Sequence, residues 1–315
     1  MSSIDTADLI RELHGRGTHR VALQLPEGLK RQGMEMARDL KKAGFSVILS
    51  GDPCYGACDL AISALAEADV LVHIGHTPVE EHPQVICLPF EQDFDLSSLD
   101  QALPLLKEER IGLVTTVQHT HLLSAAARYL ADHGIEAVIR DGSGRTPAAG
   151  QVLGCTYRAA QIEGVNEILY IGTGLFHPIG VQLATGKRVI ALDPFMQTVG
   201  EVDSSRLLRR RFGLIEKAKQ ADSFGILLST KSGQRRAAVA EHLASLDDRA
   251  VIITLQEVNP DALVNLGFGC YVNTACPRIA YDDQVRFSVP VITPEEFEIV
   301  CGMRTWDDYA VDEIR

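Results

Sequence analysis

The sequence predicts an α/β fold built from three similar small domains with parallel sheets. Three β-branched apolar runs begin near residues 20, 110 and 223, and each is followed by a polar or glycine-bearing turn and a helical pattern. A second strand-like run follows each helical pattern, and a third follows another short helical stretch. Strands that alternate with helices and are almost continuously apolar are typical of parallel sheets covered on both faces. Because the pattern occurs three times, we expect a triplicated unit in a pseudo-three-fold arrangement.

Each unit begins with a strand, a turn and a helix, in segments 20–44, 110–134 and 223–247. Apolar spacing supports the first two helices, through these residues: Met34, Ala37, Leu40 and Ala43, then Leu123, Ala126, Leu130 and His133. The second and third strands of the three units are expected in these segments: 45–52, 68–77, 135–142, 165–174, 249–256 and 268–276.

The three units are expected to join near residues 100–109 and 200–220. The first joint follows the acidic run FEQDFDLSSLDQ, and the second passes through a helix that contains the basic cluster RLLRRRF. A chain of 315 residues is longer than most single domains. We therefore predict domains at 1–105, 106–205 and 206–315.

The composition is that of an ordinary globular protein, with 46% hydrophobic and 23% charged residues. The net charge of −12 argues against a nucleic-acid groove as the main surface, because phosphate binding relies on clustered Lys and Arg. The sequence contains no apolar stretch long enough to span a membrane, and its first residues do not resemble a signal peptide. We therefore expect a cytoplasmic protein that binds neither membranes nor nucleic acid directly.

Seven cysteines are spread thinly along the chain. Thiols in the cytosol stay reduced, so a disulfide framework is not expected. Cys58 and Cys155 each follow the second strand of their unit, and Cys276 ends the third strand of the third unit. Ligands of open parallel sheets bind beyond the carboxyl ends of the strands, so each unit offers one cysteine at its functional edge.

Three thiolates that converge on one point suit an iron–sulfur cluster or a soft metal ion. A [4Fe–4S] cluster with three cysteine ligands would leave one iron open to a substrate. The spacings of 97 (155 − 58) and 121 (276 − 155) positions match no local metal motif. Buried structural cysteines therefore remain the alternative at this stage.

The remaining cysteines have simpler interpretations. Cys87 and Cys270 lie in apolar strand-like runs and are expected in the core, and Cys301 has no partner nearby in the sequence. Cys54 forms C-x3-C with Cys58, which matches the start of the radical S-adenosylmethionine signature C-x3-C-x2-C. The third position of that signature is Ala61, so the signature fails.

Eight short motifs occur in order along the chain: LQLPEGL (23–29), GDPCYGACD (51–59), VHIGHT (72–77), GCTY (154–157), YIGTGLFHP (170–178), ALDPF (191–195), TACPRIAYDD (274–283) and PVITPEE (290–296). Together the motifs resemble the archaeal diphthamide-synthesis enzymes of the 2-(3-amino-3-carboxypropyl)histidine synthase family. The resemblance extends over nearly the whole chain.

The resemblance implies a homodimer in which each chain holds one [4Fe–4S] cluster through one cysteine from each domain. The family ligands map onto Cys58, Cys155 and Cys276, which makes Cys54 a neighbour of the first ligand. The family cleaves the Cγ–S bond of S-adenosylmethionine, in contrast to conventional radical enzymes, and releases methylthioadenosine. The 3-amino-3-carboxypropyl group is added to C2 of a histidine in translation elongation factor 2, and an electron donor is required.

Polar residues near the predicted strand ends are candidates for holding S-adenosylmethionine: Glu27, His76, Gln118, His177, Thr230 and Gln234. The alternative for Gln118 is a loop side chain bonded to the backbone, and for the two histidines it is a structural role. The glycine-bearing turns IGTG and KSGQ would let a backbone approach a carboxylate or a ribose. The sequence assigns no catalytic residue beyond the cluster ligands.

Two other functions are compatible with part of this pattern. The first is a non-catalytic cluster-binding partner subunit, which the presence of all three candidate ligands argues against. The second is a quinolinate-synthase-like [4Fe–4S] enzyme, which would show other motifs than YGACD and TACPR.

Overall fold

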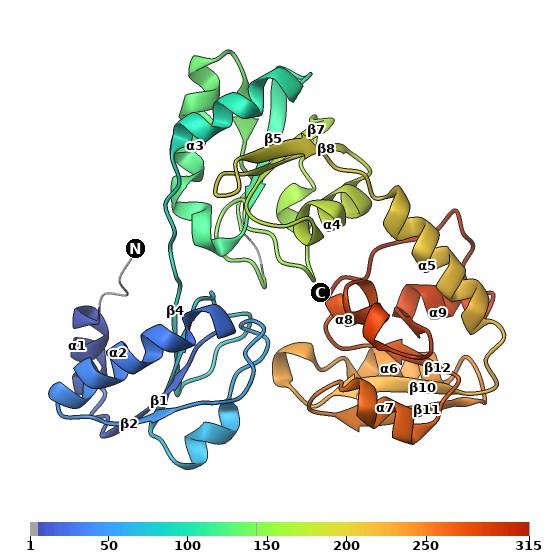
Figure 1. Ribbon diagram of the computed structural model, residues 1–315, viewed down its shortest axis with the longest axis horizontal. Helices are drawn as coiled ribbons and strands as arrows, with labels where there is room; N and C mark the ends of the chain where they lie inside the picture. The colour runs from blue at the N-terminus through green and yellow to red at the C-terminus, as the bar shows by residue number, and fades with distance from the viewer. Residues whose placement is uncertain (1–5, 143, 315) are drawn as a thin grey trace.

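The computed structural model describes residues 6–142 and 144–314 and contains three sheets, each in its own lobe (Figure 1). The first lobe has strands in the order β2-β1-β3-β4, all parallel. Its main elements are α1 (Ala7–Gly15), β1 (Arg20–Gln24), α2 (Lys30–Lys42), β2 (Ser46–Leu49), β3 (Val70–Ile74) and β4 (Val85–Leu88).

The second lobe has strands in the order β6-β5-β7-β8-β9, and only the β8–β9 pair in this sheet is antiparallel. Its elements are β5 (Arg110–Thr115), α3 (Leu123–Asp132), β6 (Glu136–Val138), β7 (Glu167–Ile171), α4 (Phe176–Thr185), β8 (Arg188–Asp193) and β9 (Thr198–Glu201). The third lobe has the parallel order β11-β10-β12-β13. Its elements are α5 (Ser205–Ala218), β10 (Phe224–Ser229), α6 (Ala237–Ala244), β11 (Ala250–Leu255), α7 (Pro260–Leu266), β12 (Cys270–Asn273), α8 (Arg278–Tyr281), β13 (Val291–Ile292) and α9 (Pro294–Val300).

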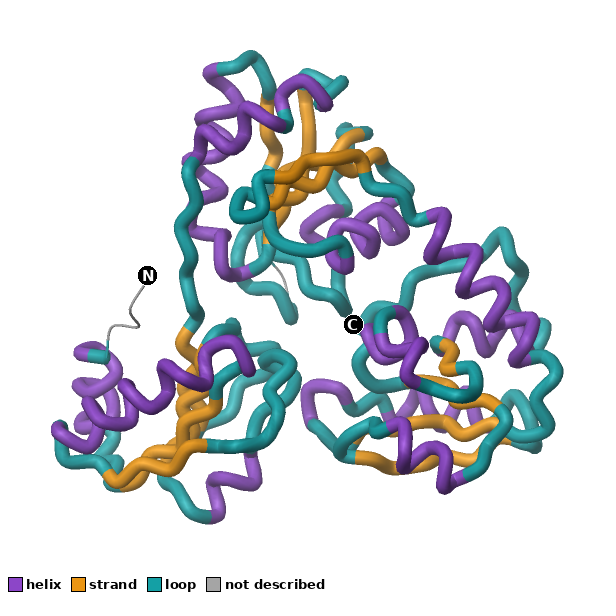
Figure 2. Tube along the Cα trace, viewed as in Figure 1, coloured by secondary structure: helices purple, strands orange, loops and turns teal. Residues whose placement is uncertain are grey.

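The three sheets share one connectivity, which agrees with the expected repeat. In each sheet the first strand of the unit lies between the second and the third, and the fourth lies beside the third. The α/β class and the six expected second and third strands are confirmed. Loops and helices, rather than strands, border the region where the lobes face one another (Figure 2).

The buried face of α2 agrees with the predicted one in part, because Leu40 is buried and Ala37 and Ala43 pack against the core. Met36 and Leu40 are buried, whereas Met34 is 53% exposed. Gly33 and Met36 occupy the buried face in place of Met34. Leu123, Ala126 and Leu130 of the predicted α3 face are buried, whereas His133 is exposed at the C-cap of the helix.

Packing does not follow the expected domain limits closely. Leu99 and Ala102 lie before residue 106 yet pack in the core of the second sheet with Ile111. Near the C-terminus, Val311 packs with Tyr157 in another core of the second lobe. The limits 1–105, 106–205 and 206–315 therefore stay a prediction. Among the described residues, no helix is both long and apolar enough to cross a membrane.

The basic cluster at the start of the third lobe does not lie on one exposed helix face. Arg211 on α5 is fully buried and forms a two-pronged ion pair with the fully buried Glu296 on α9. The same guanidinium donates to the carbonyls of Ala280 (2.6 Å) and Val291 (2.9 Å). Glu296 also completes a capping box with Thr293 at the start of α9. The pair thus joins α5, α8, β13 and α9.

Removing the charge of Glu296 should destabilise the third lobe. The substitution Glu296→Gln leaves the Arg211 guanidinium buried without its counter-ion, which costs about 3–5 kcal/mol in comparable buried pairs. The measurement is urea denaturation followed by circular dichroism. As a control, Asp39→Asn removes one partner of the exposed Asp39–Lys42 pair and should leave the unfolding midpoint unchanged. An unchanged midpoint for Glu296→Gln would contradict this interpretation.

Candidate metal centre

Cys58 lies in an irregular loop, residues 50–61, that follows β2. The loop is in contact with the third lobe. Gln234 is 5% exposed, and its amide nitrogen lies 3.4 Å from the Cys58 Sγ, which accepts its hydrogen bond. A Cβ atom on Gly233 would come 2.6 Å from the Cys58 Cα, so only glycine permits the two backbones to approach this closely.

Cys155 and Cys276 lie on loops of the other two lobes. Cys155 follows the β6 strand in a loop where Leu153 and Thr156 form an isolated bridge. Its carbonyl accepts a hydrogen bond from the backbone N–H of Ile314 (2.7 Å), which ties the C-terminal segment to this loop. Cys276 follows β12, and its carbonyl accepts a hydrogen bond from the side chain of Asn273 (2.9 Å).

The three thiols lie close enough to influence one another electrostatically. Burial is the main reason that the pKa of Cys155 is raised to about 11; the charge of Arg145 opposes this rise and that of Cys58 adds to it. Burial is also the main cause that raises the pKa of Cys276, followed by the charges of Cys58 and Cys155. Burial raises the pKa of Cys58 as well. The structure therefore brings together one cysteine from each lobe.

These sulfur atoms are spaced too widely for one metal ion. Within residues 6–142 and 144–314, a single group of three or more Cys, His, Asp or Glu ligand atoms lies within 4.8 Å, and it contains none of these three cysteines. Ligands of a cluster bind different irons, so they are farther apart than the ligands of one ion. The donor set and its spacing fit a multinuclear sulfur-ligated centre better than a mononuclear site.

Arg145 is a member of the site that the sequence did not reveal. Its Nη2 donates to the carbonyl of Gly233 (2.8 Å), and its charge lowers the pKa of both Cys58 and Cys155 against the larger effect of burial. Its Nε is buried and has no hydrogen-bond partner among the described residues. Arg145 lies in the loop DGSGRTPAAG, where no strand or helix pattern points to a position beside the cysteines.

Polar contacts connect the three lobes in pairs near the three cysteine loops. Lys231 of the third lobe forms an ion pair with Asp59 of the first (2.9 Å), and the side chain of each is less than a tenth exposed. Gln151 of the second lobe donates to Thr77 Oγ1 of the first (2.9 Å). Arg145 joins the second lobe to the third. Each lobe is thereby held to both of the others next to its cysteine loop.

The other candidate residues are distributed over several parts of the structure. Gln234 contacts Cys58, and Gln118 donates to the carbonyl of Gly75 (3.3 Å), next to His76. Burial lowers the pKa of His76 to about 4. Thr230 is exposed and borders a cleft of about 470 Å³ between the first and third lobes, which is also lined by Gln24, Asp59, Lys231 and Gln256.

Two candidates lie apart from this cleft. Glu27 is exposed and pairs with Lys30 (2.6 Å). His177 stands in the first turn of α4, where its ring stacks on Tyr170 at 6.2 Å between centroids. Burial, followed by the charge of Arg278, lowers the pKa of His177 to about 4, so the ring is neutral at physiological pH.

The remaining cysteines agree with their simpler interpretations in part. Cys270 is fully buried in the core of the third sheet, as predicted. Cys87 on β4 and Cys301 at the end of α9 are partly exposed. Cys54 is 4% exposed and lies beside two histidines.

Known proteins that are similar to this chain share its length and fold. The sequence model of the diphthamide synthesis protein family matches residues 25–311. The 2-(3-amino-3-carboxypropyl)histidine synthase from Pyrococcus horikoshii is 37% identical over 100% of this chain and 94% of its own length. Subunit 1 of the synthase from Encephalitozoon cuniculi is 30% identical over 98% of this chain and 91% of its own length.

A solved structure is equally similar. The crystal structure of Dph2 from Pyrococcus horikoshii with a 4Fe-4S cluster superposes with a TM-score of 0.94 at 37% identity. The match covers 99% of this chain and 94% of the other. The chain belongs to the diphthamide synthesis protein family.

Proposed function

We propose that this protein is a 2-(3-amino-3-carboxypropyl)histidine synthase that performs the first step of diphthamide synthesis. It transfers the 3-amino-3-carboxypropyl group of S-adenosylmethionine to C2 of a histidine and releases methylthioadenosine. The observation that carries this proposal is the convergence of one cysteine from each lobe, in a chain 37% identical to a Dph2 that was solved with a 4Fe-4S cluster. Relatives with the synthase name cover almost the whole chain.

Cys58, Cys155 and Cys276 are the residues that would hold the cluster. Their thiols come from three loops, Cys155 is buried while Cys58 and Cys276 are partly exposed, and the three sulfur atoms do not lie within 4.8 Å of one another as the ligands of a single ion would. When bound, a [4Fe–4S] cluster with three thiolate ligands supplies one electron and an iron that no cysteine occupies. This donor set supports the assignment without a fourth cysteine at the site.

The neighbouring side chains would stabilise the ionised thiolates and hold them in place. The guanidinium of Arg145 offsets the negative charge that three thiolates bring into a buried site, and its free Nε is a donor for an anionic group there. Gln234 donates to the Cys58 sulfur, which favours the ionised form. The contact of Gly233 with Cys58 leaves no space for water between the two backbones.

We infer that S-adenosylmethionine binds at the inner ends of the strands, beside the cysteines. The cleft that includes Thr230 has both a buried cation, Lys231, and a carboxylate, Asp59, which suits a zwitterionic amino-acid group. Gln234, Gln118 and His76 are proposed to complete the binding surface. For Glu27 and His177, a role in holding S-adenosylmethionine is proposed from the sequence pattern alone.

The reaction requires a protein substrate and a source of electrons. The histidine acceptor is proposed to be that of translation elongation factor 2, and a separate electron donor is proposed to reduce the cluster. A homodimer and a cytoplasmic location remain proposals based on the family resemblance. A non-catalytic subunit is disfavoured by the three converging cysteines, and a quinolinate-synthase-like activity by the family match over residues 25–311.

Replacement of any one of the three ligands should remove the cluster. After anaerobic reconstitution we expect about four irons per wild-type chain, and most of this iron should be lost in Cys58→Ala, Cys155→Ala and Cys276→Ala. Cys54→Ala should keep the iron and most of the activity, since Cys54 is not assigned to the cluster. Iron analysis and visible absorption measure both outcomes. Full iron and turnover in any of the three ligand variants would refute the ligand assignment.

The nucleoside product distinguishes this reaction from conventional radical chemistry. With dithionite, S-adenosylmethionine and the matching elongation factor, the protein should release 5′-methylthioadenosine. Mass spectrometry should show an added mass of about 101 daltons on one histidine-containing peptide of the factor, as expected for a covalent aminocarboxypropyl group. Chromatography that finds 5′-deoxyadenosine as the main product, or an unmodified factor despite a reduced cluster, would overturn the proposed function.

A further inference from the structure

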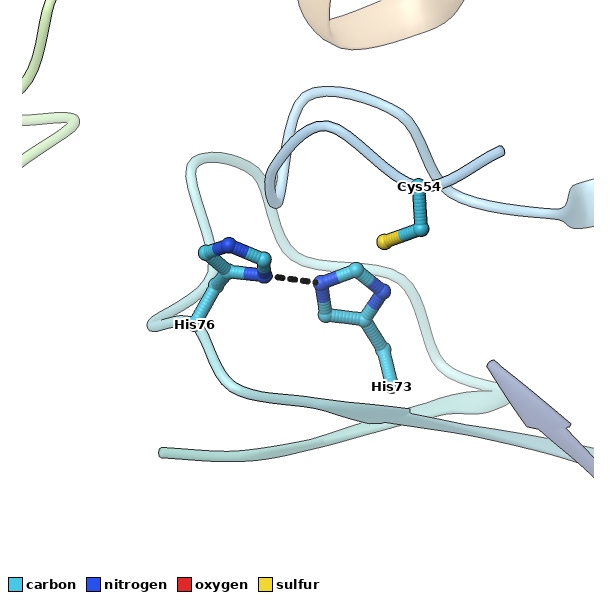
Figure 3. A group of neighbouring side chains, drawn as sticks. All are labelled: Cys54, His73 and His76. Atoms are coloured by element: carbon cyan, nitrogen blue, oxygen red, sulfur yellow. Dashed lines mark hydrogen bonds between the residues drawn. The ribbon is translucent and has the colours of Figure 1, made fainter. Parts of the chain in front are cut away.

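A second group of potential metal ligands includes one residue of the 50–61 loop and none of the three cysteines described above. Cys54, His73 and His76 each place one ligand atom within 4.8 Å of the other two (Figure 3). Cys54 comes from the 50–61 loop, His73 from β3, and His76 from the turn after β3. Cys54 and His73 are buried. The group thus connects the loop to the carboxyl end of β3.

The hydrogen bonds around His73 determine which of its ring nitrogens has the lone pair. The Gln24 amide is fixed by two backbone partners, because its Nε2 donates to the carbonyl of Asp59 (2.6 Å) and its Oε1 accepts from the N–H of Ala61 (3.0 Å). Gln24 Oε1 must therefore accept the hydrogen bond with His73 Nδ1 (2.9 Å) as well. The neutral His73 ring consequently has its lone pair on Nε2, which faces His76 Nδ1 at 3.0 Å.

His73 has the hydrogen-bonding arrangement that is typical of a metal-binding histidine. Histidines that ligate a metal usually donate their other ring N–H to a carbonyl or carboxylate oxygen, which fixes the ring and its tautomer. Gln24 provides that oxygen for His73. The carboxylate of Asp59 also lies close to this loop and accepts, at 3.4 Å, from the N–H of Tyr55 next to Cys54.

The distances agree with a tetrahedral ion. Zinc–nitrogen bonds of about 2.0–2.1 Å place two nitrogen ligands about 3.3 Å apart, and the two ring nitrogens are 3.0 Å apart before any ion is bound. One thiolate and two imidazoles form a donor set that zinc accepts, with a fourth position for water or another ligand.

We propose that Cys54 Sγ, His73 Nε2 and His76 Nδ1 form a binding site for a divalent transition-metal ion of the zinc type. On binding, the Cys54 thiol loses its proton to solvent. The His76 proton moves from Nδ1 to Nε2, so the ring stays neutral and one proton is released per ion. The ion fastens the loop that contains Cys58 to the end of β3, which gives Cys54 a role distinct from cluster ligation.

The test uses the full chain with its iron–sulfur cluster loaded, so that zinc cannot occupy the other cysteines. The protein is incubated anaerobically with zinc chloride, desalted, and analysed for zinc and iron in the same sample. About one zinc per chain is expected, and X-ray absorption at the zinc edge should show one sulfur and two nitrogen neighbours from the protein. Cys54→Ser and His76→Gln should each reduce retained zinc at least tenfold while iron stays at the wild-type amount.

Cys301→Ser is the matched control, because Cys301 lies at the C-cap of α9 in the third lobe, and it should retain wild-type zinc. Circular dichroism of each variant establishes that it is folded, and His76→Gln provides a partly exposed alternative if Cys54→Ser fails to fold. Less than a tenth of an equivalent of zinc in the wild-type protein would overturn the proposal. So would wild-type zinc in folded Cys54→Ser or His76→Gln, or a zinc shell without sulfur. These outcomes do not depend on the synthase activity.

Discussion

The close approach of the Cys58 loop to the third lobe is the constraint on which the site depends. Each of the three sheets is built from its own continuous segment of the chain, and each lobe contributes only one of the three cysteines that converge. Direct contact between the backbones at Gly233 and Cys58 sets how near the first and third lobes come. The buried Lys231–Asp59 pair and the Gln151–Thr77 hydrogen bond then fix the orientation of the lobes around the sulfur atoms.

The electrostatics of the site follow from these contacts between the lobes. Three thiols that are shielded from water resist ionisation, as the raised pKa values of Cys58, Cys155 and Cys276 show. One nearby cation, Arg145, bonds to the Gly233 carbonyl and thus depends on the same contact between lobes. The positive charge of the irons would offset the cost of ionising the three thiols in a buried site. Assembly of the lobes and binding of the cluster are therefore expected to support each other.

Much of the fold follows from the sequence because strand and helix periodicity are local properties. The alternation of strands and helices predicted the three sheets, and the apolar spacing of α3 predicted its buried face. The face of α2 was predicted except at Met34, which is exposed while Met36 is buried. The buried Arg211–Glu296 pair was also missed, because a basic cluster shows charge but not which side chain meets a carboxylate 85 residues away. Motif resemblance supplied the three cysteines, whereas Arg145 and the Cys54–His73–His76 group depend on contacts that no spacing encodes.

The substitution Gly233→Ala tests most directly whether the site depends on contact between lobes. The added Cβ would meet the Cys58 backbone, which cannot move away without shifting the cysteine. Gly213→Ala, where an added Cβ has open space, is the matched control. After anaerobic reconstitution, iron per chain should fall severalfold in folded Gly233→Ala and stay at the wild-type amount in Gly213→Ala. Wild-type iron in Gly233→Ala would contradict the account.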